Sequence, residues 1–138
     1  MSEKAEKYYA KIEEYLNRDF FKKTDRKISF LIGKYYSSLA YKEKKELKTT
    51  SLYTKLPVLT KRLDNEQIYK LADKCNSVVK RLISKNKSTS KTEARLWEKL
   101  NDLLSKDEWE SSHYELSLAF MMGFTFYVES EEENESEE

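Results

Sequence analysis

The sequence predicts an all-α protein, and three observations lead to that prediction. The chain has only two glycines and one proline among its 138 residues, whereas turn-rich β folds need many of both. Apolar residues recur at spacings of three and four, which is the period of an amphipathic helix. Charged residues make up 37% of the chain, enough to cover the outer faces of several helices. We therefore expect one helical bundle of about five helices over residues 1–128.

Two helices are expected in the N-terminal third. The first covers about Glu3–Phe21, with Ser2 as its N-cap. The second covers about Asp25–Lys48, with Thr24 as its N-cap and the Asp25 carboxylate favoured by the dipole of the first turn. The predicted core face of the second helix consists of Ile28, Leu31, Ile32, Tyr35 and Leu39.

The middle of the chain contains one irregular segment and one clear helix. In Leu52–Leu63 we expect a short helix or turn on either side of Pro57, because a proline disfavours helix at the preceding residue. Asp64–Gln67 has the pattern of a capping box. The helix that it opens, to about Lys85, has apolar residues at spacings of three and four: Ile68, Leu71, Cys75, Val78, Val79 and Leu82.

Two further helices and a tail complete the chain. A second capping-box pattern, Ser90–Glu93, opens a helix whose apolar residues are Leu96, Trp97, Leu100, Leu103 and Leu104. The last helix covers about Ser111–Val128 and is apolar on nearly all sides from Leu116, as expected at the centre of a bundle. Residues 129–138 hold seven glutamates and no basic residue, so we expect an acidic disordered tail there.

Both glycines, Gly33 and Gly123, fall inside predicted helices. A glycine inside a helix costs about 1 kcal/mol relative to alanine. Close approach of another helix would compensate for that cost. We therefore expect both glycines to lie at helix crossings.

Cysteine content and apolar patterning bear on location. A single cysteine excludes an internal disulfide and favours a reducing compartment. The first residues contain no apolar signal core. The longest apolar stretch, Leu116–Val128, is too short to span a bilayer. We expect a cytoplasmic protein with no membrane contact.

The residues that carry catalysis or hold metals are scarce. Cys75 and His113 are the one cysteine and the one histidine, too few for a zinc site or for a nucleophile with its base. Cys75 lies on an apolar helix face, where burial is the simpler interpretation. Asp64–Glu66 is better explained as a helix cap than as a cation site. We expect no catalytic residue, metal or cofactor, and keep an enzyme with a carboxylate-only site as an alternative.

The net charge of +1 conceals a strong asymmetry. The chain has 26 basic and 25 acidic residues, and seven of the acids lie in the tail. The body therefore carries +8 and the tail −7. A basic body is what could meet a polyanion.

Basic residues follow one edge of two predicted helices. On the Asp64–Lys85 helix they fall within about 60° of Lys70. On the Asp25–Lys48 helix, lysines alternate with Phe30, Ser37 and Tyr41, a combination that suits single-stranded nucleic acid. The candidate nucleic-acid-binding residues are Lys34, Lys44, Lys61, Arg62, Lys70, Lys74, Arg81, Lys85, Lys87 and Lys91. A merely solvated lysine face is the competing interpretation.

One pattern suggests a family. The segment Lys27–Tyr35 opens a long helix, a middle helix pair follows, and the chain closes on Leu116–Phe124. This order, over Asp25–Val128, resembles the small subunit of type I CRISPR Cascade complexes, in particular the I-B form, which looks like the C-terminal part of the large subunit. The acidic tail is not part of that family's pattern.

The resemblance implies a non-catalytic helical bundle, present in more than one copy per complex. Its partners would be the backbone and large subunits of Cascade, the crRNA and the target DNA. Its role would be to support crRNA–target pairing and to stabilise the R-loop, an exchange so nearly balanced that modest backbone contacts can tip it. Two alternatives remain: the small subunit of a type III CRISPR effector complex, and a helical protein–protein adaptor that does not bind nucleic acid.

Overall fold

The computed structural model describes the backbone of residues 2–59 and 63–137 and the side chains of residues 6–56 and 63–126. The described α-helices are α1 (Ser2–Leu16), α2 (Thr24–Lys42), α3 (Ser51–Leu59), α4 (Asn65–Ser84), α5 (Lys91–Leu104) and α6 (His113–Glu137). A 3₁₀ turn, η1 (Asp19–Lys22), precedes α2, and a π-helical turn, η2 (Glu43–Leu47), follows it. No strand occurs in this part of the chain, and the all-α prediction is confirmed.

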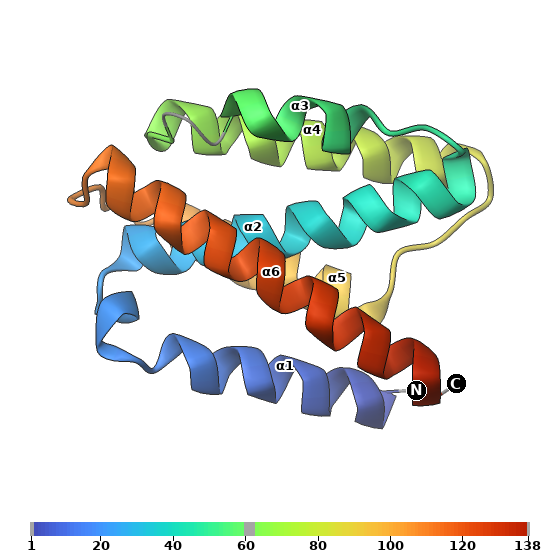
Figure 1. The fold of residues 1–138 in the computed structure, drawn as a ribbon, viewed down its shortest axis with the longest axis horizontal. Helices are drawn as coiled ribbons and strands as arrows, with labels where there is room; N and C mark the ends of the chain where they lie inside the picture. The colour runs from blue at the N-terminus through green and yellow to red at the C-terminus, as the bar shows by residue number, and fades with distance from the viewer. Residues whose placement is uncertain (1, 60–62, 138) are drawn as a thin grey trace.

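Helix α2 is the centre of the bundle (Figure 1). It contacts α3, α4, α5 and α6. Every side chain from residue 28 to residue 40 is buried. We expected α6 to hold the central position, and that expectation is wrong. On α6, Leu118 and Met121 are each 41% exposed. Helix α6, which is apolar on nearly all sides, therefore lies partly at the surface. Helix α2, which contains lysines and serines, lies inside the bundle.

The two glycines make the crossing of α2 and α6 possible. A Cβ at Gly33 would lie 3.1 Å from the Phe124 nitrogen and would overlap the Phe120 carbonyl. A Cβ at Gly123 would lie 3.1 Å from the Lys34 nitrogen and would overlap the Phe30 carbonyl. Each glycine therefore admits the backbone of the other helix. The prediction that both lie at helix crossings is confirmed, and they lie at the same one.

The start of α2 differs from the expected cap. Thr24 is the first helical residue, Lys23 occupies the N-cap position without a side-chain bond, and the Thr24 hydroxyl donates to Glu108. The Asp25 carboxylate is buried and accepts from the Glu110 and Ser111 N–H groups at 2.7 and 2.6 Å. The Asp25 side chain therefore holds the segment before α6 in place and does not cap its own helix.

Two other boundaries differ from expectation. Helix α1 ends at Leu16, and the predicted continuation to Phe21 is replaced by η1, where Phe21 turns into the core. Helix α3 runs through Pro57 without a break. The proline forfeits the one hydrogen bond that its nitrogen cannot donate, and the helix ends two residues later.

The predicted N-caps of α4 and α5 are both present, and the reciprocal capping box is formed at α5. The Asp64 carboxylate accepts from the Gln67 N–H at 2.8 Å, which supports the cap over a cation site. Ser90 and Glu93 form a reciprocal capping box, with bonds of 3.1 and 2.8 Å. Ser112 and Glu115 form a similar box before α6, so that helix begins at His113 rather than at Ser111.

The core contains the apolar faces expected of α4 and α5. Cys75 is fully buried among them, and burial raises the pKa of its thiol. Trp97 is half-buried and stacks on Tyr35, with ring centroids 5.7 Å apart. The bounds of α6 include most of the acidic segment 129–138. The side chains of that segment lie outside the described residues, and its disorder stays a prediction.

Candidate nucleic-acid interface

The outer face of α4 carries part of the predicted basic stripe. Lys70 and Lys85 are exposed, and Lys74 is half-buried. Lys70 lies 3.8 Å from the exposed Glu66 carboxylate one turn earlier, so its charge is partly offset. The amphipathic pattern of α4 therefore placed these side chains on the correct side of the helix.

Lys74 meets a second lysine from α3. The pKa of the Lys74 ammonium is lowered, first by its interaction with the neighbouring Lys55 ammonium and then by partial burial. Two like charges held side by side repel each other, and an anion between them would relieve the repulsion. This pair lies about 16 Å along α4 from its C-terminal end.

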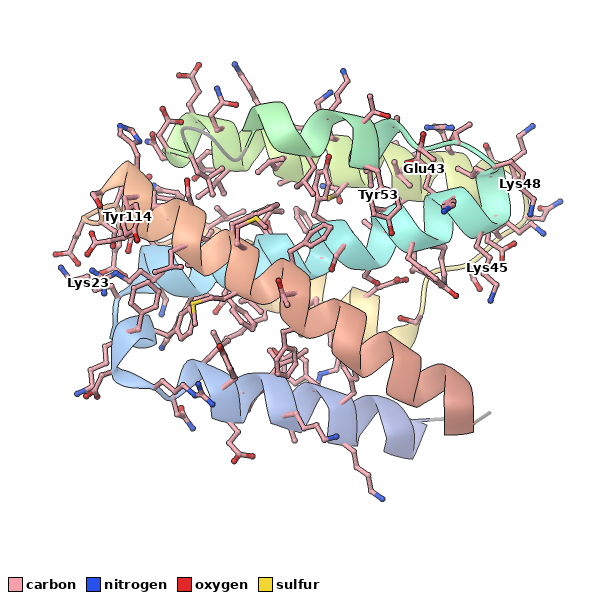
Figure 2. The ribbon with its side chains drawn as sticks, in the orientation of Figure 1. Lys23, Glu43, Lys45, Lys48, Tyr53 and Tyr114 are labelled. Carbon is pink, nitrogen blue, oxygen red and sulfur yellow. The ribbon has the colours of Figure 1, made fainter. Side chains whose placement is uncertain are left out.

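Arg81 has a structural role in the fold. It donates to the Glu43 carboxylate at 3.2 Å and to the Thr49 hydroxyl at 3.1 Å. Glu43, labelled in Figure 2, is fully buried and also accepts from Thr49, Ser51 and the Leu52 N–H. Burial alone would raise the pKa of Glu43, but these hydrogen bonds outweigh it and the pKa is lowered.

Glu43 therefore joins three elements. It ends α2, holds the start of α3 through Ser51 and Leu52, and reaches α4 through Arg81. The Arg81 side chain remains 45% exposed, but its Nη1 and Nη2 already donate to Glu43 and Thr49. Arg81 is part of the predicted basic stripe, but in the folded protein it binds Glu43 and Thr49.

Six exposed lysines gather at one end of the bundle, which we call the basic end. It consists of the lysines of η2 and its last turn and those of the α4–α5 connection: Lys44, Lys45, Lys48, Lys85, Lys87 and Lys91. All six are exposed. Figure 2 shows Lys45 and Lys48 at this end, beyond Glu43.

Three contacts hold the two parts of the basic end together. Lys87 lies 3.4 Å from Glu46 of η2. The Lys42 ammonium donates to the Ser88 carbonyl at 3.1 Å, and Arg81 reaches Thr49. The structure thus brings Lys44 of one predicted stripe to Lys85, Lys87 and Lys91 of the other.

Part of this positive charge has a purely local explanation. The C-terminal ends of α2 with η2 and of α4 both lie here, and each contributes about half a negative charge. Glu46 adds one more, while Glu43 and Glu93 are matched by Arg81 and Lys42. Against six lysines, these groups leave an excess of about four positive charges. Helix dipoles alone therefore do not account for the basic end.

Lys34 is a correction to the predicted stripe. Its side chain is fully buried, and its Nζ lies 4.0 Å from the centroid of the Tyr8 ring. Phe30 and Ser37, which were expected to accompany it at the surface, are buried as well. The stripe fails because α2 is covered on all sides. Lys61 and Arg62 lie outside the described residues.

Lys45 joins the candidate surface, as do Lys48 and Lys55, which the sequence pattern had placed along or beside the predicted stripes. The signal for the first two was the lysine run after Tyr41. The chain turns at Lys48, the expected end of the second helix, and the Lys48 φ of 59° is the left-handed conformation typical of a helix end. This turn collects the η2 lysines at the end of the bundle.

The other surface features are less distinctive. A groove of about 540 Å³ between α1 and α5 is lined by acids and bases together, among them Glu13, Arg95, Lys99 and Asp102. The described residues contain no group of three potential metal ligands. Over the same residues, no helix is long and apolar enough to cross a membrane.

The fold and this surface define an all-α bundle with a cationic end. Comparison with protein-family models, curated proteins and solved structures finds no match to the chain.

Proposed function

We propose that this chain is a non-catalytic nucleic-acid-binding subunit, and the observation that supports it is the basic end. Six exposed lysines meet there from segments far apart in the sequence. Their excess charge goes beyond what local acids and helix ends offset. Phosphate groups are the anions that such a sequence-indifferent surface suits best.

The surface favours contact with the nucleic-acid backbone over contact with the bases. Tyr41, beside the lysines of η2, is half-buried, with the Lys45 ammonium 5.9 Å from the centroid of its ring. Base stacking needs an open aromatic face. The Lys55–Lys74 pair adds a second cationic site on α4, about 16 Å from its C-terminal end.

In its specific form, the proposal is a small subunit of a CRISPR Cascade complex in the reducing cytoplasm. It would support crRNA–target DNA pairing beside the backbone and large subunits, in more than one copy. The support is the resemblance of Lys27–Tyr35 and Leu116–Phe124 to that family. These two segments pack against each other at the Gly33–Gly123 crossing, so they belong to one helix–helix contact of the bundle.

Fluorescence anisotropy with a labelled single-stranded DNA of about 20 nucleotides tests the general proposal. Changing Lys44, Lys48, Lys85 and Lys91 to glutamate should weaken binding at least about 100-fold at low salt, because four attractions become repulsions. The matched control changes Lys7, Lys22, Lys99 and Lys106, which are exposed elsewhere, and should weaken binding far less. Equal losses in both variants would refute the location of the interface.

RNA that co-purifies with the chain from its native source tests the Cascade proposal. A Cascade or type III subunit should bring down repeat–spacer RNA together with backbone subunits, and the composition of the complex distinguishes the two types. An adaptor should bring down proteins without RNA. That last result would overturn the CRISPR assignment.

A further inference from the structure

We propose that the exposed face of α6 binds the same face of a second copy of the chain, with the two helices antiparallel. Four exposed residues form this face, which we call the α6 stripe: Tyr114, Leu118, Met121 and Thr125. Their spacing along the chain places them within about 60° around the helix. Tyr114 is 76% exposed, and Leu118 and Met121 are each 41% exposed. Helix α6 lies on one broad face of the molecule (Figure 1), so the stripe is open to a partner.

The α6 stripe has a protruding aromatic ring at one end and a groove at the other. Tyr114 lies in the first turn of α6 (Figure 2). The groove, of about 340 Å³, is lined by one residue of α1 and four of α6: Tyr15, Met121, Met122, Thr125 and Phe126. Methionine side chains adapt to the shape of a partner and make favourable contacts with an aromatic ring. The groove therefore suits an inserted tyrosine ring.

Antiparallel pairing brings the ring of each copy to the groove of the other. When Leu118 lies opposite Met121 of the second copy, Tyr114 lies opposite Thr125 of that copy, because both pairs fit the same register. Two-fold symmetry then repeats both contacts, as an interface between identical surfaces requires. A parallel pairing would instead place Tyr114 against Tyr114 and leave both grooves empty. The stripe is thus complementary to itself in one direction.

The charge of this face also favours a second copy. Between Tyr114 and Phe126, the one charged residue in the sequence is Glu115. Its carboxylate already accepts from the Arg26 guanidinium and from the Ser112 N–H. Two copies of the stripe can therefore meet without bringing like charges together. The stripe offers no cation to a phosphate, so it is a surface separate from the basic end, and the pairing does not depend on nucleic-acid binding.

The size of the contact indicates a weak dimer. From Tyr114 to Thr125 the stripe extends over about 17 Å of helix. Stable complexes typically bury about 800 Å² on each partner, which is more than one such stripe provides. We therefore expect dissociation constants in the micromolar range, roughly 10–100 µM.

Sedimentation velocity of the full chain tests the self-association. Between about 1 and 500 µM, in about 0.3 M salt to screen charged contacts, the mean mass should rise from that of the monomer towards that of the dimer. Tyr114→Ala should weaken the association about 10-fold or more, because an aromatic side chain in a groove is a typical hot spot. The control, Ile83→Ala, removes an apolar side chain of α4 that is 62% exposed and should leave it unchanged. A monomer at every concentration, or equal losses in both variants, would overturn the pairing.

Disulfide trapping tests the direction and the register. Two variants, Tyr114→Cys and Thr125→Cys, are oxidised separately and as an equal mixture, and the native Cys75 does not compete because it is fully buried. The mixture should give a covalent dimer, since the two positions face each other across the interface. Each variant alone should give at least about 5-fold less, because identical positions lie about 16 Å apart along antiparallel helices and a disulfide needs Cα atoms within about 7 Å. Equal trapping in all three samples, or no trapping in the mixture, would overturn the proposed register.

Discussion

Helices α2 and α4 both have lysines among apolar residues, but the exposure of those lysines differs between the two helices. Helix α4 has a single buried face and leaves Lys70 and Lys85 in solvent. Helix α2 is packed on all sides and buries Lys34 completely. A periodic pattern identifies the exposed face of a peripheral helix. For a central helix, the same pattern identifies a face that another helix covers.

The largest test of this difference is at the crossing itself. Changing Gly123 to valine should destabilise the fold by about 4 kcal/mol or more, above the usual cost of overpacking, because the obstacle is the Phe30 carbonyl on a backbone that cannot rotate away. Urea unfolding followed by circular dichroism measures it. The control, Ser77 to valine on the exposed face of α4, should change stability by less than about 1 kcal/mol.

The second test compares one lysine from each helix. Lys34 to glutamate should cost about 3 kcal/mol or more, because it places an anion in a buried site against the Tyr8 ring. Lys85 to glutamate should stay within about 0.5 kcal/mol. Lys34 to methionine, which keeps the volume, should cost less than about 1.5 kcal/mol. Equal effects of the two glutamate changes would show that Lys34 is not buried.

The third test addresses Glu43, which connects the end of α2 to α4. Glutamine at this position keeps the shape but offers one acceptor oxygen to donors from Thr49, Ser51, Leu52 and Arg81. We expect a loss of about 2 kcal/mol at neutral pH, because buried donors are left unpaired. Chemical unfolding of both proteins gives the difference.

The difference in stability between the wild type and Glu43→Gln should also depend on pH. The folded pKa of Glu43 is lowered from 4.5, so its stabilising contribution is complete above the unfolded pKa and is lost as the pH falls through the folded pKa. The advantage of the wild type over Glu43→Gln should therefore shrink below about pH 4.5. An advantage that is constant from pH 7 to pH 3 would contradict the lowered pKa.

The smallest expected effect concerns Cys75 on the buried face of α4. Burial raises the pKa of its thiol, so a thiol reagent should label it only as fast as the protein opens. Cys75 to alanine should cost about 1 kcal/mol. Rapid labelling of the native protein would show that α4 is not packed on α2 as described.

Much of the fold was predictable because it follows from local chemistry. Ser90 and Glu93 cap α5 through bonds within four residues, and the α4 core face follows from helical periodicity. Gly33 and Gly123 were informative because a glycine inside a helix needs a reason. The centre of the bundle was not predictable, because burial of Lys34 and Ser37 depends on which helices surround α2.

The candidate surface was predictable only in part, for a similar reason. Lys70, Lys74 and Lys85 follow from the face of one helix. The meeting of Lys44 with Lys87 and Lys91 depends on the turn at Lys48 and on the contacts of Glu43 and Glu46. These contacts join segments about 40 residues apart, as the Arg81–Glu43 bond does with a separation of 38, and no local pattern encodes them.

The salt dependence of single-stranded DNA affinity tests the basic end most directly. With about four phosphates neutralised, log affinity should fall against log salt with a slope near −3 for the wild type. The slope should be close to zero when Lys44, Lys48, Lys85 and Lys91 are glutamates, and should keep most of its size in the control with Lys7, Lys22, Lys99 and Lys106 reversed. The same slope in the wild type and in the basic-end variant would contradict the account.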